Sequence, residues 1–287
     1  SAVDLHEEIK ALLQEVDASL SMFNPQSVIS KINRNEECTT DTLFEWMYRE
    51  AYAISELSGG AFDITVAPLV NAWGFGIKGQ TPTTSNKICI DSIMPYIGYY
   101  KTNLIDHQIE KNDPRITLDA SAIAKGYACD VVANMLRNEG CANLLVDIGG
   151  EVVVQGINNN GNAWRVGISK PKKNAMGMED ELQEVVESTN LCMATSGNYL
   201  QYYFVDGQRR SHTIDPRTGY PVEHSLLSAT VTASSGMRAD ALATACMVLG
   251  EKEALKIIEQ TEDAACYLIV ADNDTLRITK SKRWELK

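Results

Sequence analysis

Two oxygen-bearing side chains four residues apart carry the clearest chemical signal in this sequence. Asp240 and Thr244 lie in the helix-forming stretch 238–245. Because four residues span about one helical turn, both side chains would lie on the same face. A carboxylate and a hydroxyl are hard oxygen ligands, which suit Mg²⁺ better than a transition metal. The alternative is a surface aspartate beside a buried threonine whose hydroxyl bonds back to its own helix.

A second candidate site lies where an expected strand runs into a helix. Asp119 is placed near the expected N-cap, and an acidic N-cap commonly does no more than satisfy backbone amides. Lys125 follows inside the helix, between Ala124 and Gly126. A long cationic side chain there could reach a phosphate bound near the helix start. The segment therefore fits either a helix cap or a phosphate site.

Two other segments are unusually rich in glycine or polar residues. In residues 59–63 a glycine helix stop meets a strand, which fits either a helix cap with a core phenylalanine or a shelf for a ligand. His212 lies in a polar stretch beside Arg209 and Arg210. An imidazole in such surroundings can act as a general acid or base near neutral pH. Residues 215–221 carry turn chemistry, Asp-Pro followed by Thr-Gly-Tyr-Pro.

Composition limits the class of protein. The chain has 287 residues, 44% of them hydrophobic and 22% charged, which is typical of a globular protein with a substantial core. Its formal net charge of −12 argues against a general nucleic-acid binder, because such proteins need a cationic surface to displace phosphate counterions. Any phosphate site must therefore be built locally, from backbone amides, a metal or one or two basic side chains.

Several other kinds of site lack their defining residues. The seven cysteines are scattered without a CxxC pair and the four histidines are dispersed, so no zinc site is expected. The glycine loop of Walker-type kinases is absent. No apolar stretch approaches the ~20 residues that a membrane-spanning helix needs, so we expect the chain as given to be soluble.

The elements that must position these residues alternate irregularly, which favours an α+β fold forming one structural unit. Apolar periodicity predicts helices over residues 3–20, 27–33, 40–58, 90–97, 121–138, 237–249 and 252–260. Alternation and turn residues predict strands over residues 102–105, 108–111, 115–118, 144–146, 151–155, 164–168, 182–187, 191–194, 201–205, 229–233, 265–270 and 275–278.

Taken together, the candidate segments resemble the ApbE family of FAD:protein FMN transferases. The resemblance runs from about residue 12 to the C-terminal region, and it rests on the joint order of the motifs rather than on any one of them. The matching pieces are Leu20 to Phe23 with Ser27 and Asn33, Gly59 to Asp63, Asp119 to Asp130, Gly149 to Glu151, Trp164, Thr195 to Gly197, His212 to Pro221, and Asp240 to Thr244.

The resemblance implies a single ApbE-like domain over residues 1–287, related to the T-fold, with two lobes around an FAD cleft. The implied activity is the Mg²⁺-dependent transfer of FMN from FAD to a threonine or serine of an acceptor protein, such as a redox-pump subunit, through a phosphoester. Two alternatives are an FAD pyrophosphatase that releases FMN and AMP, and a non-catalytic FAD-binding protein. Family members are mostly extracytoplasmic or periplasmic, so we expect a lipid-anchored, membrane-attached precursor.

The resemblance also assigns roles to individual residues. The Mg²⁺ ligands would be the backbone carbonyl of Ala122, the carboxylate of Asp240 and the hydroxyl of Thr244. His212 would deprotonate the incoming hydroxyl or orient the phosphate, and Asp240 would join it in catalysis. The FAD-binding residues would be Phe23, Ala61, Phe62, Asp63, Asp119, Lys125, Thr195, Ser196, Gly197 and Leu227.

Two features depart from the family pattern. Many relatives carry tyrosine where this sequence has Phe23, which retains ring stacking but lacks the phenolic hydrogen bond. The family also usually begins with a Gly-Thr-containing strand that adds a flavin contact, and this sequence starts after it, at Ser1. We expect the missing strand to weaken FAD affinity, to leave a sheet edge exposed, or to be replaced by a partner chain.

Overall fold

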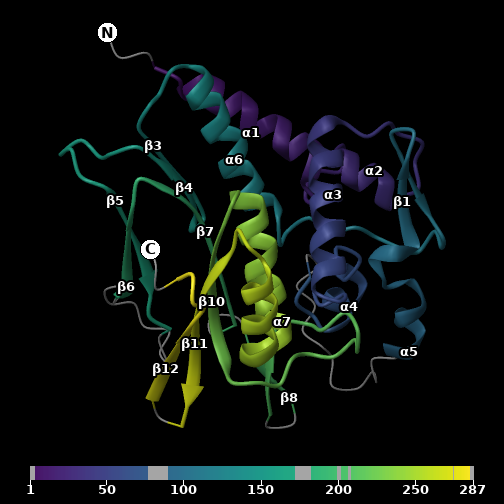
Figure 1. The fold of residues 1–287 in the computed structure, drawn as a ribbon. Helices are drawn as coiled ribbons and strands as arrows, with labels where there is room; N and C mark the ends of the chain where they lie inside the picture. The colour runs from purple at the N-terminus through teal and green to yellow at the C-terminus, as the bar shows by residue number, and fades with distance from the viewer. Residues whose placement is uncertain are drawn as a thin grey trace. The chain divides into compact units, whose positions relative to one another are not determined.

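The computed structural model describes residues 4–76, 90–171, 182–198, 202–205, 208–273 and 275–284. The chain divides into two compact units (Figure 1). Unit 1 comprises Ser1–Ala124 and Tyr203–Val222, and unit 2 comprises Lys125–Tyr202 and Glu223–Lys287. Helices and antiparallel strands occur together, which confirms the predicted α+β class. No helix in the described ranges is long and apolar enough to cross a membrane.

Unit 1 is built mainly from helices, and polar side chains cap the starts of α2 and α3. Ser27 caps α2 by accepting a hydrogen bond from the Ser30 amide at 3.1 Å, at the start of the helix predicted over residues 27–33. Asp41 caps the next long helix through the Phe44 amide at 2.8 Å. The elements are α1 (His6–Leu20), α2 (Val28–Asn33), α3 (Thr42–Leu57), α4 (Ala67–Ala72), α5 (Ile90–Ile93), the 3₁₀ turns η1 (Met94–Tyr96) and η2 (Tyr99–Lys101), and the hairpin β1 (Thr102–Ile105) and β2 (Gln108–Lys111).

Three predictions for unit 1 are wrong. The strand expected after the glycine helix stop does not form, because residues 61–66 are bends and turns that lead into α4. Residues 115–118 do not form a strand, because a side chain takes the place of a neighbouring strand: Asn33 accepts from the Leu118 amide at 2.7 Å and donates to its carbonyl at 2.8 Å. The helix predicted over 90–97 is split into α5 and η1. Pro95 lies at the start of η1, and because it has no N–H group it cannot continue the α-helical hydrogen bonds.

Unit 2 is built on a six-stranded sheet with strand order β12-β11-β10-β7-β4-β3, in which every neighbouring pair is antiparallel. Helix α7 packs against one face (Figure 1). The other face buries alternating residues such as Val152, Val154 and Tyr267 against the separate β5–β6 hairpin. The strands of unit 2 are β3 (Leu144–Ile148), β4 (Glu151–Gln155), β5 (Trp164–Ser169), β6 (Leu182–Ser188), β7 (Asn190–Gly197), β10 (Leu226–Ala233), β11 (Ala265–Asp272) and β12 (Thr275–Lys280). Strands β8 (Tyr202–Val205) and β9 (Gln208–Ser211) form a two-stranded sheet that, apart from Tyr202, belongs to unit 1.

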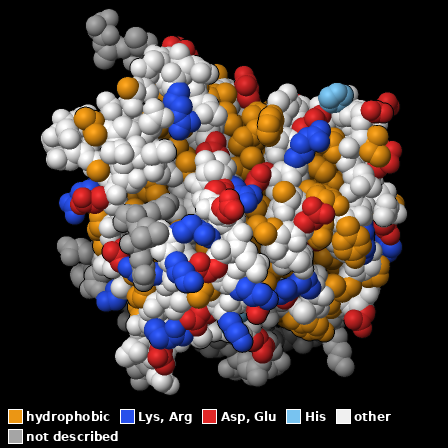
Figure 2. Space-filling view, viewed as in Figure 1, with side chains coloured by type: hydrophobic (Ala, Val, Ile, Leu, Met, Phe, Trp, Pro, Cys, Tyr) orange, Lys and Arg blue, Asp and Glu red, His pale blue; other side chains and the backbone are white. Residues whose placement is uncertain are grey.

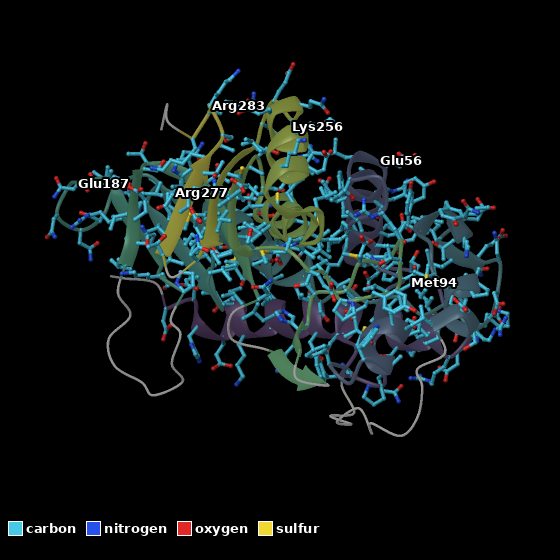
Figure 3. All side chains as sticks on the ribbon, turned by 90° about the horizontal axis from the view of Figure 1, so that it is seen from below. Glu56, Met94, Glu187, Lys256, Arg277 and Arg283 are labelled. Atoms are coloured by element: carbon cyan, nitrogen blue, oxygen red, sulfur yellow. The ribbon has the colours of Figure 1, made fainter. Side chains whose placement is uncertain are left out.

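Helix α7 (Gly236–Gln260) is interrupted at Gly250, whose φ of 74° and ψ of 171° are not helical. The two helices predicted over 237–249 and 252–260 therefore correspond to its two segments. The C-terminal segment ends at a cationic cap, because the guanidinium of Arg283 donates to the carbonyls of Ile258 and Thr261 at 2.5 and 2.7 Å (Figure 3). A cation is favourable there because the last carbonyls of a helix carry partial negative charge.

Helix α6 (Ala124–Asn138) begins three residues later than predicted and meets the start of α7. The backbones of Gly126 and Gly236 approach so closely that a Cβ atom on Gly126 would lie 2.1 Å from the Gly236 carbonyl oxygen. Asp130 of α6 accepts the amides of Gly236 and Met237 at 2.7 and 2.8 Å, and so caps the first turn of α7. The contact thus combines close packing with capping.

We expect Gly126→Ala to destabilise the protein by about 2–3 kcal/mol, because the added methyl group would meet backbone atoms that cannot move aside. A loss of stability would be informative, because replacing a glycine inside a helix with alanine ordinarily stabilises a protein. Urea unfolding measures the change. Gly167→Ala on β5 is the control, because its methyl group would meet only the movable end of the Leu182 side chain. Equal losses in the two variants would contradict the backbone contact.

Candidate functional site

A buried carboxylate on α7 lies at the start of α6. Asp240 is only 3% exposed, and its Oδ2 accepts the Gly126 amide at 3.0 Å. Gly126 is the third residue of α6, so this amide is one of the helix-start donors that have no partner within the helix. Burial, followed by the charge of Glu151, raises the pKa of Asp240 to about 7, against the lowering effects of the Gly126 amide and Lys125. The predicted alternative of a surface aspartate is wrong.

Glu151, the first residue of β4, is a second buried carboxylate of this unit. It is 2% exposed, and its Oε1 accepts from the Lys125 ammonium at 2.5 Å. Its Oε2 has no hydrogen-bond partner among the described residues. Gly149 and Gly150 precede it in the tight turn from β3, both with positive φ, and only glycine adopts that conformation at little cost. The sequence showed this glycine turn and glutamate as a family motif, but neither burial nor the Lys125 partner could be read from it.

Thr244 lies one turn after Asp240 on α7, beside a strand of the sheet. Its hydroxyl is 3.2 Å from the Ser196 hydroxyl on β7. Thr195 pairs instead with Thr230 across the sheet, through hydroxyls 2.8 Å apart. The structure therefore brings together Asp240, Thr244 and Ser196, three of the residues singled out from the sequence.

The remaining predicted residues of unit 2 lie where β7 meets β10. Gly197 pairs with Ser228 at the end of β7. Leu227 is half-buried at an irregularity in the register between Leu226 and Ser228, where its carbonyl accepts the Asn198 amide at 3.0 Å. Their assignment to an FAD site stays a prediction.

In unit 1 the predicted ligand shelf at residues 61–63 is largely interior. The side chains of Ala61 and Phe62 are 1% and 2% exposed, as expected of a helix cap followed by a core phenylalanine. Asp63 is also buried and organises the turn: it accepts the Thr65 amide and hydroxyl at 2.8 and 2.7 Å and the Tyr99 amide at 2.8 Å. Burial raises the pKa of Asp63, while these hydrogen bonds oppose the rise.

Asp119 and Ala122 lie in the turn that leads into α6. Asp119 accepts the amide and hydroxyl of Ser121 at 2.8 and 2.5 Å, so it caps this turn rather than the first turn of α6 itself. Ala122, the predicted carbonyl ligand, is half-buried and belongs to unit 1, whereas Asp240 belongs to unit 2. Their predicted roles toward a ligand stay predictions.

His212 and Phe23 are both accessible side chains of unit 1. The half-buried imidazole of His212 packs edge-on against Phe75, with ring centroids 6.1 Å apart, and Phe23 is 74% exposed. The predicted turn after His212 is confirmed: Asp215 accepts the Arg217 amide and binds its guanidinium through both carboxylate oxygens. The side chains of Arg209 and Arg210 lie outside the described residues.

The donor set around Asp240 suits a hard divalent cation that shares its coordination with a ligand. Within the described ranges no group of three or more His, Cys, Asp or Glu side chains could hold a metal by itself. Mg²⁺ is usually bound through one or two carboxylates together with substrate phosphates and water, rather than in an all-protein cage. Asp240 and Thr244 are the oxygen donors that could form such a partial set, and the predicted contact of Lys125 with a phosphate stays a prediction.

Surface charge agrees with the acidic composition. On the face drawn in Figure 2, lysine and arginine side chains lie among aspartates and glutamates. With a formal net charge of −12, this mixed surface differs from the continuous basic face that nucleic-acid binders use.

We expect Asp63→Ala to lower the free energy of unfolding by about 2–4 kcal/mol, because the Thr65 and Tyr99 donors would lose their shared acceptor in a buried turn. Chemical denaturation measures the loss. Asp91→Ala on the exposed surface of α5 is the matched control and should change stability by less than about 0.5 kcal/mol. A loss no larger than that of the control would show that the hydrogen bonds at Asp63 contribute little.

The chain is similar to known proteins over most of its length. A sequence model of the ApbE family matches residues 1–268. The FAD:protein FMN transferase of Haemophilus influenzae is 36% identical over 96% of this chain and 81% of its own length, and that of Escherichia coli K12 is 35% identical over 99% and 82%. The flavin transferase ApbE from Vibrio cholerae has a TM-score of 0.88 at 34% identity, covering 98% of this chain and 89% of its own. The chain belongs to the ApbE family.

Proposed function

We propose that this protein transfers FMN from FAD to a threonine or serine of an acceptor protein, with Mg²⁺ as the required cation. The observation that carries the proposal is the arrangement at the start of α6. Buried Asp240 binds the Gly126 amide, Thr244 lies one turn away, and Lys125 extends from the same helix start. Full-length relatives named FAD:protein FMN transferase support the same chemistry.

Attack on a pyrophosphate requires neutralisation of its negative charge and stabilisation of the leaving AMP. Mg²⁺ held at this site would supply that neutralisation. Asp240 and Thr244 offer a carboxylate and a hydroxyl to hold it, and the carbonyl of Ala122 is the third ligand that we propose. The Gly126 hydrogen bond orients the Asp240 carboxylate.

The basic residues have separate roles in this proposal. An ammonium has three donors, and Lys125 uses one on Glu151, which leaves others for phosphate oxygens. His212 is the base that takes the proton of the incoming hydroxyl, a role that an accessible imidazole can perform near neutral pH. The flavin half of FAD would lie along the residues assigned from the family, with the ring of Phe23 available for stacking.

Two other functions predict different products from the same site. An FAD pyrophosphatase would use water as the acceptor and release FMN and AMP. A protein that only stores or senses FAD would bind it without breaking the pyrophosphate. The extracytoplasmic location and the identity of the acceptor, for which we favour a redox-pump subunit, also stay predictions.

The decisive experiment mixes the protein with FAD, Mg²⁺ and a peptide bearing an acceptor threonine. We expect a covalent FMN adduct by mass spectrometry and stoichiometric AMP. Asp240→Asn should reduce turnover by at least about 100-fold while leaving the unfolding midpoint in place, because it removes a cation ligand and preserves side-chain volume. AMP without adduct would favour the pyrophosphatase, and FAD binding with neither product would exclude both enzymes. Full activity of Asp240→Asn would remove this residue from the metal site.

We expect His212→Ala to lower the transfer rate by about 100-fold or more, with the dissociation constant for FAD nearly unchanged, because a general base acts on the reacting hydroxyl rather than on the bound nucleotide. Single-turnover kinetics measure the rate, and fluorescence titration measures FAD binding. Phe75→Leu is the control for the ring contact, since it alters the packing around His212 without removing the base. An unchanged rate in His212→Ala would assign the histidine to structure.

A further inference from the structure

A carboxylate oxygen without a partner lies in the interior of unit 2. Glu151 is 2% exposed, and only its Oε1 is used, by the Lys125 ammonium. Its Oε2 has no hydrogen-bond partner among the described residues. Buried polar atoms almost always have a hydrogen-bond partner. An unpaired oxygen on a buried carboxylate therefore indicates that an ion or a ligand supplies the missing partner in the working protein. A purely structural ion pair would not require this arrangement.

Among the described residues, the charge of Glu151 is only partly compensated. Asp240 is also buried, at 3% exposed, and Glu151 is close enough to repel it. In the described part of the chain, the cation that pairs with Glu151 is the Lys125 ammonium, whose side chain is half-exposed to water. The helix start at Gly126 adds only a partial positive charge. Glu151 is thus a buried carboxylate that Lys125 compensates through one oxygen only, in a place where charges interact strongly.

We propose that Glu151 makes the binding of a pyrophosphate-bearing nucleotide at this site conditional on a divalent cation. Its negative charge attracts the cation and repels metal-free phosphate, so the two ligands bind cooperatively. Thermodynamic linkage makes the effect reciprocal: the factor by which the cation tightens the nucleotide is the factor by which the nucleotide tightens the cation. This inference rests on the proposed function for the choice of ligand, and it adds Glu151 as a determinant of specificity for the metal-bound substrate.

Glu151→Gln tests the proposal because it removes the charge while keeping the size and an acceptor oxygen for Lys125. Isothermal titration would give three dissociation constants: for FAD and for inorganic pyrophosphate, each in EDTA, and for Mg²⁺ alone. We expect the metal-free ligands to bind more tightly and Mg²⁺ to bind more weakly, each on the order of tenfold, as one charge at short range in a protein pocket implies. A merely structural role would weaken both or neither.

Two further variants separate charge from packing. Lys125→Met removes the positive charge at a half-exposed position, so it should shift the dissociation constants in the opposite directions. Metal-free pyrophosphate should bind more weakly and Mg²⁺ more tightly. Glu184→Gln breaks another glutamate–lysine pair of unit 2, with Lys280 at 3.0 Å, and should leave all three constants unchanged. Thermal unfolding of each variant checks that it folds. If Glu151→Gln does not fold, the signs seen in Lys125→Met decide the question.

The outcomes separate this inference from the proposed function. Unchanged constants in Glu151→Gln, or metal-free ligands and Mg²⁺ all weakened together, would overturn the role of Glu151 even in a protein that forms the FMN adduct. Opposite shifts for metal-free ligands and Mg²⁺ would support it even if the wild-type protein yields no adduct or AMP. In that second case only the proposed reaction would be contradicted, and the role of Glu151 would stand.

Discussion

The close approach of α6 to α7 is the constraint on which the unit 2 site depends. Two glycines, Gly126 and Gly236, allow the backbones to meet. In that position each helix supplies a carboxylate to the start of the other, Asp130 to α7 and Asp240 to α6. Helix starts need acceptors for their first amides, so this reciprocal arrangement satisfies backbone and side chains together. A residue with a Cβ at either glycine would separate the helices and leave donors and carboxylates unpaired.

The same arrangement concentrates negative charge where stability alone would not place it. The opposite face of the sheet is an apolar core of valine, leucine and aromatic residues. On the α7 side, Asp240 and Glu151 are both buried, with a single half-exposed lysine beside them. Burying charges in this way is unfavourable unless they are compensated. Local departures from good packing and pairing of this kind are characteristic of functional sites, where stability is given up for binding.

Local sequence patterns predicted the features that depend on neighbours in the chain. The helix that starts at Ser27, the strands of the hairpin β1–β2 and the interruption of α7 near Gly250 follow from residues close together, and the structure confirms them. The spacing of Asp240 and Thr244 likewise predicted one helical face. Long-range pairs were beyond such patterns: Asn33 satisfies Leu118 from 85 residues away, and so removed an expected strand. The burial of Glu151 and its pairing with Lys125 depend on the folded sheet, which no local pattern contains.

The division of the chain into discontinuous units affects how it can fold as it is synthesised. Unit 1 includes Tyr203–Val222, which follows some eighty residues belonging to unit 2. Unit 2 in turn needs β10, α7, β11 and β12, all of which come after that insertion. Domains often fold one after another from the N-terminus during translation, but here neither unit is complete until the ribosome has passed residue 222. The apolar cluster of Leu69, Ile90 and Ile97 therefore cannot be completed by Ile214 until that later segment has been synthesised.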